Sequence, residues 1–368
     1  QHFTEEQFDG LDYLKGNNRI IFKGPAGTGK TFLAIEAARR AVSERKSILL
    51  LCYNNLLGDW LKSQTSSLMN ENNLFRCGTF HSILLDITGE KPVEGASEEY
   101  WQKRLPILAA DVLLDDERKC PLYDMLIVDE AQDLITEEYL DVLDLLLIGG
   151  LAGGKWAFFG DFERQAIYLS KIGEGASRAL ESLAVRAPNH VNCTLRINCR
   201  NAEPIAETLT ITSGLTPGYK RVLHDYEGSD VDPLFYSFAV DQPTLLKKAI
   251  NSLTGTFNAH EIVVLSMRGD NASCAGSVTE NSLYKLAPIR KIRDVHTIPF
   301  TSIHAFKGLE AAAVIITDIE SLDDERSRAL LYVGMSRARI RLYMLMHESC
   351  RRSYDRILDS GLEKTSRR

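Results

Sequence analysis

The octapeptide Gly24–Thr31 constrains this chain more than any other stretch. It reads Gly-Pro-Ala-Gly-Thr-Gly-Lys-Thr, which has the form G-x-x-x-x-G-K-[ST]. The apolar run Ile20–Lys23 precedes it, and residues 32–45 carry leucine, alanine and valine at helical spacing. Strand, glycine-rich loop and helix in this order favour phosphate binding, because backbone amides and a helix N-terminus then point at the phosphates. We therefore predict that Lys30 contacts the β- and γ-phosphates and that Thr31 is a ligand of Mg²⁺.

Composition sets broad limits on what the chain can be. It has 368 residues, 44% hydrophobic and 25% charged, which is typical of a soluble globular protein with two domains. The net charge of −7 excludes a uniformly basic, histone-like protein, yet nucleic-acid binding needs only a local basic stripe. No apolar run approaches ~20 residues and no signal peptide is visible, so we expect no membrane span.

The cysteines indicate the compartment. There are seven, an odd number without a C-x-x-C pair, which favours reduced thiols and a cytoplasmic protein. The chain begins at Gln1 without a methionine, which is consistent with a piece of a longer polypeptide.

Strand and helix patterns alternate along the whole chain, which predicts an α/β fold with parallel sheets. Two alternating sets meet near Ala187–Asn189, where we place the domain boundary. The first domain then covers residues 1–188, with a small helical insertion at about 88–122, and the second covers residues 189–368. The second domain has no G-K-[ST] motif of its own.

A second motif lies where the apolar run Leu126–Val128 ends in two carboxylates, Asp129 and Glu130. In a phosphate-loop enzyme, carboxylates at the end of such a strand face the nucleotide. Asp129 can therefore hold Mg²⁺, and Glu130 can orient and deprotonate the attacking water. The alternative is a pair of solvated carboxylates in a turn.

Three further side chains can contact the γ-phosphate. Gln165 follows the strand that ends at Gly160–Asp161, and a neutral amide there can sense the γ-phosphate without titrating. Arg200 and Arg337 lie in the second half, and phosphoryl transfer needs cations that face the transferred group. A turn with a surface glutamine and two ordinary surface arginines are the alternatives.

A series of motifs in order extends these patterns over nearly the whole chain. They are Glu5–Gln7, Gly24–Thr31, Cys52–Asn55, Thr79–Ser82, Val128–Asp133, Gly160–Tyr168, Asn198–Arg200, Ser302–Glu310 and Leu331–Arg339. Together they make the chain similar to the UvrD/Rep-like superfamily 1 helicases, for which D-E-A-Q-D and H-x-x-K-G-L-E are highly specific. The sequence around Leu50–Leu61 resembles the subgroup often fused to a NERD nuclease domain.

The resemblance implies two RecA-like domains with ATP and Mg²⁺ bound between them. It implies that Gln7 reads the adenine edge and that Glu310 bonds the ribose. The remaining nucleotide contacts that it implies are the phosphate loop (Gly24, Pro25, Ala26, Gly27, Thr28, Gly29, Lys30, Thr31), the metal partner Asp129, the base Glu130, and Gln165, Arg200 and Arg337 at the γ-phosphate.

The resemblance also implies contacts to a single strand of nucleic acid. Polar groups at helix starts suit phosphate oxygens, and aromatic rings suit stacked bases. The implied residues are Tyr53, Asn54, Asn55, Thr79, Phe80, His81, Tyr168, Ser302 and His304. His81 and His304 can instead be structural residues at helix starts.

The chain departs from the family at several points, two of which concern the adenine contact and the handling of duplex. Cys199 stands where the family usually has an aromatic residue that stacks on adenine. The stretch between Ser273 and Thr301 is also too short for the large helical insertion that relatives carry there. A core reduced in this way is expected to translocate or switch, yet to unwind duplex poorly by itself.

Two functions follow from these observations. The first is an ATP-driven 3′→5′ translocase or helicase, with single-stranded DNA or a duplex with a 3′ tail as its partner. The alternative is a nucleic-acid- or nucleotide-gated ATPase that regulates a partner or fused nuclease, for example in DNA repair or anti-phage defence.

Overall fold

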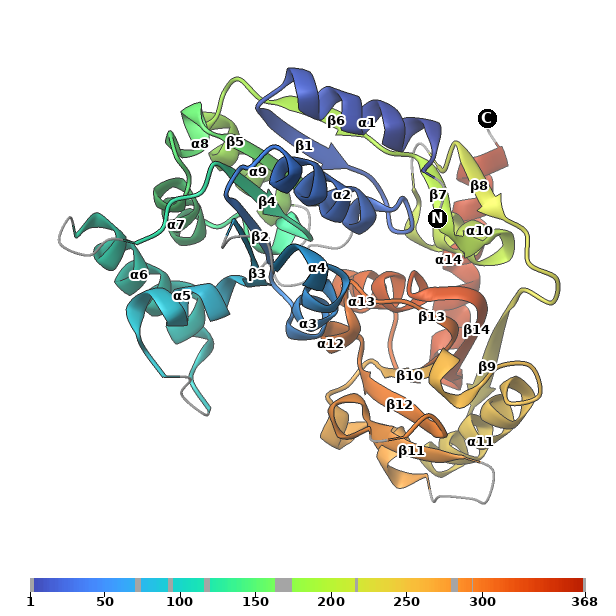
Figure 1. The fold of residues 1–368 in the computed structure, drawn as a ribbon. Helices are drawn as coiled ribbons and strands as arrows, with labels where there is room; N and C mark the ends of the chain where they lie inside the picture. Colours follow the sequence, from blue (N-terminus) through green and yellow to red (C-terminus); the bar gives the residue numbers. More distant parts are fainter. Residues whose placement is uncertain are drawn as a thin grey trace. The chain divides into compact units, whose positions relative to one another are not determined.

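The chain forms two compact units, each built on its own parallel sheet (Figure 1). The computed structural model describes residues 3–69, 74–91, 95–115, 120–162, 174–215, 218–278, 284–292 and 294–366. The first unit comprises Gln1–Pro25 and Gly29–Leu195, and the second comprises Ala26–Thr28 and Arg196–Arg368.

The first unit contains a sheet of six strands within the described residues, drawn in blue to yellow-green in Figure 1. In spatial order the strands are β3 (Phe75–Thr79), β2 (Ile48–Cys52), β4 (Met125–Val128), β5 (Lys155–Gly160), β1 (Arg19–Lys23) and β6 (Val191–Thr194). All neighbouring pairs are parallel. Parallel strands are covered on both faces, which explains why β2 and β4 are continuous apolar runs rather than alternating ones.

One helix precedes these strands and further helices connect them. They are α1 (Glu5–Gly16), α2 (Lys30–Ser43), α3 (Asn55–Gln64), α4 (Ser66–Met69), α5 (Phe80–Thr88), α6 (Leu105–Leu114), α7 (Glu137–Leu146), α8 (Gly150–Gly153) and α9 (Glu174–Arg186). One turn of π-helix, Tyr100–Arg104, leads into α6, and one turn of 3-10 helix, Ala131–Asp133, follows the two carboxylates after β4.

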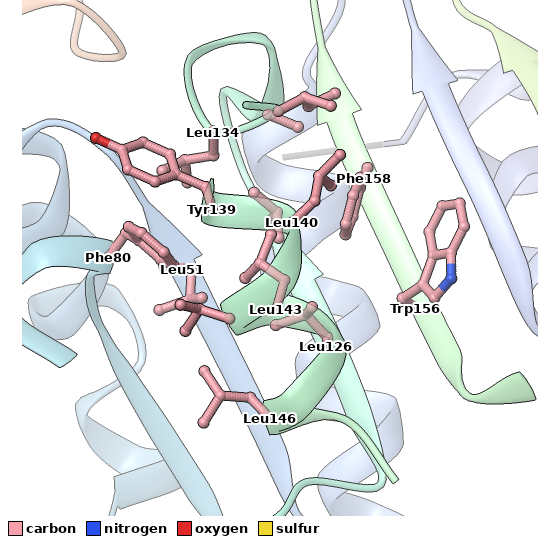
Figure 2. Packing of buried hydrophobic residues seen from close by; sticks show 14 of the residues in the cluster. Leu51, Phe80, Leu126, Leu134, Tyr139, Leu140, Leu143, Leu146, Trp156 and Phe158 are labelled. Atoms are coloured by element: carbon pink, nitrogen blue, oxygen red, sulfur yellow. The ribbon is translucent and has the colours of Figure 1, made fainter. Parts of the chain in front are cut away.

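A large cluster of buried side chains in the first unit lies between the sheet and α7 (Figure 2). Leu140, Leu143 and Leu146 recur on one face of α7 and pack on Leu126 and Phe158 of the sheet. Each fully buried side chain of this size contributes about 1.5–3 kcal/mol relative to leaving it exposed, so this cluster stabilises the packing of α7 on the sheet. The strand ends that carry the candidate site are therefore held by a rigid scaffold.

The second unit has the same kind of architecture. Its larger sheet has six parallel strands among the described residues, in the order β11 (Lys285–Pro288), β12 (Thr297–Ser302), β10 (Ile262–Ser266), β13 (Ala311–Ile319), β14 (Ala338–His347) and β9 (Asp230–Tyr236). A small parallel pair comprises β7 (Ile197–Ala202) and β8 (Arg221–His224). Its α-helices are α10 (Glu203–Ser213), α11 (Gln242–Leu253), α12 (Ile303–Phe306), α13 (Glu325–Met335) and α14 (Arg351–Ser366).

The predicted α/β fold with parallel sheets is confirmed. Six of the described strands, β3, β6, β7, β8, β11 and β12, were not expected from the sequence. Two of them, β3 and β12, read Phe-Arg-Cys-Gly-Thr and Thr-Ile-Pro-Phe-Thr-Ser, and neither is a continuous apolar run. Among the helices that the structure describes, none combines the length and the apolar character needed to cross a bilayer.

Candidate nucleotide site and strand-binding residues

The phosphate loop follows β1 at the carboxyl edge of the first sheet. Lys23 at the end of β1 pairs with Gly160 at the end of β5, and the Gly24 N–H donates to the Gly160 carbonyl at 3.3 Å. Val128 at the end of β4 pairs with Phe158 of the same β5. Because the strands are parallel, the loop and the carboxylate Asp129 follow strands that end at one edge of one sheet.

The loop geometry suits phosphate binding. Gly29 has φ = +78°, a left-handed conformation that glycine adopts without strain, and α2 begins at the next residue, Lys30. No side chain caps the N-terminus of α2, which leaves that end to backbone amides. The Lys30 ammonium is largely buried and donates to the carbonyls of Gly24 and Pro25 at 2.7 and 2.9 Å.

Asp129 is a strongly perturbed group of the site. Its carboxylate is 1% exposed, and it accepts a hydrogen bond from the Thr31 side chain. Burial, followed by repulsion from Glu130, raises the pKa of Asp129 to about 7, although the Thr31 hydroxyl and the Lys30 charge oppose the shift.

This pair of side chains fits a magnesium ion. Asp129 Oδ2 is buried and has no hydrogen-bond partner among the described residues. A buried carboxylate oxygen of this kind is costly unless a cation or a donor reaches it. Carboxylate and hydroxyl oxygens are ligands that Mg²⁺ prefers, so the residues present suit the metal.

Glu130 has an unusual backbone conformation, and its carboxylate is bonded by Gln132, a residue to which the sequence analysis assigned no role. Its backbone has φ = +50° and ψ = +43°, which is uncommon for a residue with a side chain. The Gln132 side chain donates to Glu130 Oε2 at 2.5 Å and accepts from the Asp161 N–H at 3.1 Å. Gln132 therefore ties the carboxylate to the end of β5. The sequence feature that could have identified Gln132 is its position inside the D-E-A-Q-D motif.

Space around this bridge is tight at Gly160. A Cβ on Gly160 would lie 2.6 Å from Gln132 Oε1 and 2.8 Å from the Phe162 ring. Glycine at the end of β5 therefore leaves room for both the Gln132 bridge and the Phe162 ring.

Ala26–Thr28, the tip of the loop, belongs to the second unit by its contacts. The Ala26 N–H donates to the Tyr332 hydroxyl at 3.1 Å, and the Tyr219 hydroxyl donates to the Ala26 carbonyl at 2.8 Å.

Gly27, the next residue of the loop, contacts the segment around Cys199. The Gly27 carbonyl accepts from the Cys199 N–H at 2.8 Å. Gly27 has φ = +80°, and a Cβ there would lie 2.5 Å from Asn201 Oδ1.

Arg200 and Glu310 meet in the second unit. Arg200 Nε lies 2.6 Å from Glu310 Oε2, and Arg200 Nη1 donates to the Ser336 carbonyl at 3.4 Å. Arg339 lies farther from Glu310, at 3.8 Å. The structure thus brings together residues that the sequence places in three separate motifs.

Arg337 follows Ser336 directly and is 1% exposed. Its Nε donates to the Val333 carbonyl at 3.0 Å, and its Nη2 donates to Ser336 Oγ at 2.8 Å. The alternative of an ordinary surface arginine is therefore wrong for Arg337, because its guanidinium is buried.

The other two predicted nucleotide contacts are Gln7, which has a structural role in α1, and Gln165. Gln7 is the N3 residue of a capping box on α1: its side-chain oxygen accepts from the Thr4 N–H at 2.9 Å, while Thr4 Oγ1 accepts from the Gln7 N–H at 3.2 Å. Gln165 lies outside the described residues.

Three of the predicted polar strand contacts are helix N-caps. Asn54 Oδ1 accepts from the amides of Leu56 and Leu57, and Thr79 and Ser302 do the same for α5 and α12. Asn55 is exposed at the start of α3, and Tyr168 lies outside the described residues. The side-chain oxygens of these three residues therefore already accept hydrogen bonds from backbone amides at the starts of their helices.

The aromatic and histidine candidates divide by burial. Phe80 is fully buried against Tyr139, with ring centroids 4.6 Å apart, so its ring has no exposed face on which a base could stack. Tyr53 is half-buried. His81 Nε2 lies 3.0 Å from the Tyr139 hydroxyl. Burial lowers the pKa of both His81 and His304 to about 4.

Two family models match the chain. Residues 2–146 match the model described as type III restriction enzyme, res subunit, and residues 298–345 match the UvrD-like helicase C-terminal domain. A comparison with curated proteins found no match. The matches and the two parallel sheets support a helicase of superfamily 1 or 2, built from RecA-like domains, that hydrolyses ATP and binds nucleic acid.

Proposed function

We propose that the protein is an ATP- and Mg²⁺-dependent motor of the UvrD/Rep-like superfamily 1 type that moves 3′→5′ on single-stranded DNA. One observation carries the proposal most directly. The buried Asp129 carboxylate accepts a hydrogen bond from Thr31 next to the phosphate-loop lysine, and one of its oxygens has no protein partner among the described residues. This arrangement suits a nucleoside triphosphate with its metal ion.

The residues of the first unit then have defined tasks. Lys30 leaves its backbone carbonyl partners to bind phosphate oxygens, and the amides at the start of α2 bind the same group. Thr31 and Asp129 would hold Mg²⁺, which neutralises charge that develops on the phosphates. Glu130 takes a proton from the attacking water, and the Gln132 bridge keeps its carboxylate in position.

The residues of the second unit supply positive charge. We assign Arg200 and Arg337 to the γ-phosphate and Glu310 to the ribose, and Gln165 to the γ-phosphate as a sensor. The buried position of Arg337 and the ion pair of Arg200 support this, because a desolvated guanidinium interacts more strongly with phosphate than an exposed one.

The direct test is the ATPase rate of the full chain without nucleic acid and with single-stranded DNA, single-stranded RNA or blunt duplex. We expect the strongest stimulation by single-stranded DNA. Glu130→Gln should lower turnover by at least about 100-fold while ATP binding survives. Glu137→Gln is the matched control, since it removes a carboxylate from an exposed ion pair in the same unit and should leave turnover unchanged.

Polarity is tested by displacement of a labelled strand from 3′-tailed and 5′-tailed duplexes. We expect displacement only from the 3′ tail. Stimulated turnover without displacement from either substrate would refute unwinding and leave a translocase or a nucleic-acid-gated ATPase. Full turnover by Glu130→Gln would remove Glu130 from the mechanism.

A further inference from the structure

An aromatic and basic segment, Tyr-Trp-Gln-Lys-Arg at Tyr100–Arg104, stands out in the first unit. It forms one turn of π-helix that leads into α6. A π-helical turn inserts an extra residue into the helical ladder and re-aims the side chains around it, and such turns are frequent at functional sites. Neither the nucleotide site nor the predicted strand contacts include any residue of this segment.

Trp101 contacts its neighbours through both its ring and its backbone carbonyl. Its ring packs edge-on against His81, with centroids 5.4 Å apart and planes at 67°, and against Tyr100 at 5.1 Å and 83°. The Tyr139 hydroxyl donates to the Trp101 carbonyl at 3.4 Å. The Trp101 residue is nevertheless partly exposed, in contrast to Trp156, which is completely buried.

The residues that pack against Trp101 follow strands at the carboxyl edge of the sheet. His81 lies in the first turn of α5, directly after β3, and Tyr53 directly follows β2. Their rings lie 5.2 Å apart, with planes at 71°. Cys52 and Thr79, the last residues of these two strands, pair with each other. Trp101 therefore belongs to an aromatic cluster built on the ends of β2 and β3.

Two cations follow Trp101. Lys103 and Arg104 are exposed, and neither forms an ion pair with any residue of the described part of the chain. The nearby carboxylate of Glu98 instead accepts from the Gln102 amide at 2.7 Å. A partly exposed tryptophan held by its neighbours, followed by two exposed cations that have no ion-pair partner among the described residues, is a combination that suits single-stranded nucleic acid.

We propose that Trp101 is a stacking platform for one base of single-stranded nucleic acid, and that Lys103 and Arg104 contact the adjoining phosphates. This proposal rests on the proposed function, and it adds three residues to those that would contact the nucleic-acid strand. Phe80 cannot stack on a base because it is fully buried, whereas Trp101 is held in place before binding and loses little side-chain entropy when a base arrives.

The experiment measures the affinity of the full chain for a fluorescein-labelled oligonucleotide by anisotropy, in DNA and in RNA, with intact bases and with a run of abasic positions. Trp101→Ala should weaken binding of the intact strand by about 5- to 100-fold. Trp101→Phe should retain most of the affinity, and Trp101→Leu, which keeps apolar packing without a π-face, should not. Tyr13→Ala removes an aromatic side chain that is 50% exposed on α1 and is the matched control.

The abasic strand separates stacking from a structural role. Wild type should bind the abasic strand more weakly than the intact one, and in Trp101→Ala the ratio of the two affinities should be about 5- to 100-fold smaller than in wild type. A variant that only damaged the insertion would weaken both strands by the same factor and keep their ratio, which would overturn the proposal. Trp101→Ala with wild-type affinity would overturn it as well.

The cations are tested by salt dependence. Lys103→Ala and Arg104→Ala should each lower the slope of log affinity against log salt concentration by about 0.7, the value for one phosphate contact on a single strand. Lys248→Ala, an exposed lysine on α11, should leave the slope unchanged. An unchanged slope in both variants would refute the phosphate contacts.

Failure of this proposal is distinguishable from failure of the proposed function. Wild type that binds no single strand, DNA or RNA, would overturn both. Wild type that binds and shows stimulated ATPase activity, with Trp101→Ala unaffected, would overturn the stacking platform alone.

Discussion

Arg200 and Glu310, which lie 110 positions apart in the chain, form an ion pair with 2.6 Å between Nε and Oε2. The Arg200 side chain is 13% exposed, so this pair is only weakly screened by solvent. A guanidinium paired in this way can bind a phosphate either by sharing its remaining donors or by exchanging its carboxylate partner. If Arg200 binds the γ-phosphate as proposed, its pairing with Glu310 sets how many of its donors are available for that contact.

The first prediction concerns Arg200. Arg200→Ala should lower the rate of ATP hydrolysis by at least about 100-fold, because it removes a charge that stabilises the transition state. The measurement is single-turnover hydrolysis at saturating single-stranded DNA. Arg268→Ala is the matched control, since Arg268 pairs with Glu320 at the surface of the same unit and should matter little. A rate within about threefold of wild type would exclude Arg200 from catalysis.

The second prediction concerns Gly160. Gly160→Ala places a methyl group 2.6 Å from Gln132 Oε1, which must then move and release Glu130. Turnover should fall by about 10-fold or more, since small displacements of a catalytic group are costly, while the protein stays folded by circular dichroism. Gly153→Ala, where a Cβ would meet nothing within 4 Å, should be neutral. Equal activity of the two variants would show that the Gln132 bridge does not position Glu130.

The third prediction concerns Thr31. Thr31→Val keeps the shape of the side chain and removes the hydroxyl that bonds to Asp129. The Mg²⁺ concentration for half-maximal ATPase activity should rise by about 10-fold or more, because a ligand and its orienting hydrogen bond are both lost. Thr208→Val, which removes a hydroxyl that donates only to the Pro204 carbonyl within α10, is the control. An unchanged Mg²⁺ requirement would argue against Thr31 as a ligand.

The fourth prediction concerns the pH dependence of stability. Burial lowers the pKa of His81 from 6.5 to about 4, so between these values the unfolded chain binds a proton that the folded chain excludes. Stability that is present above pH 6.5 is therefore lost as the pH falls toward 4. The loss attributable to His81 should be on the order of 1–3 kcal/mol.

His81→Gln removes this contribution and keeps a polar partner for Tyr139. Chemical denaturation at pH 7.5 and pH 5 should show that the variant loses less stability than wild type as the pH falls. His304, whose pKa is lowered to about 4 by the same cause, should give a parallel result in His304→Gln. A wild-type loss that neither substitution reduces would show that other groups control acid stability.

The sequence alone determined the phosphate loop, the position of the two carboxylates and the parallel α/β class. These features are local. A glycine-rich loop between a strand and a helix is defined by consecutive residues, and continuous apolar runs such as β2 and β10 indicate strands buried on both faces. The strands β3 and β12 lacked such a run and were therefore not found from periodicity.

Only the tertiary structure decided which side chains meet. The Gln132 bridge, the Arg200–Glu310 pair and the support of Trp101 by His81 each join residues whose partners are set by strand order and helix packing. Burial was also decided there: Phe80 and Arg337 could not be told from exposed residues until the packing around them was known. Contacts between distant residues depend on the whole fold, and no short stretch of sequence encodes them.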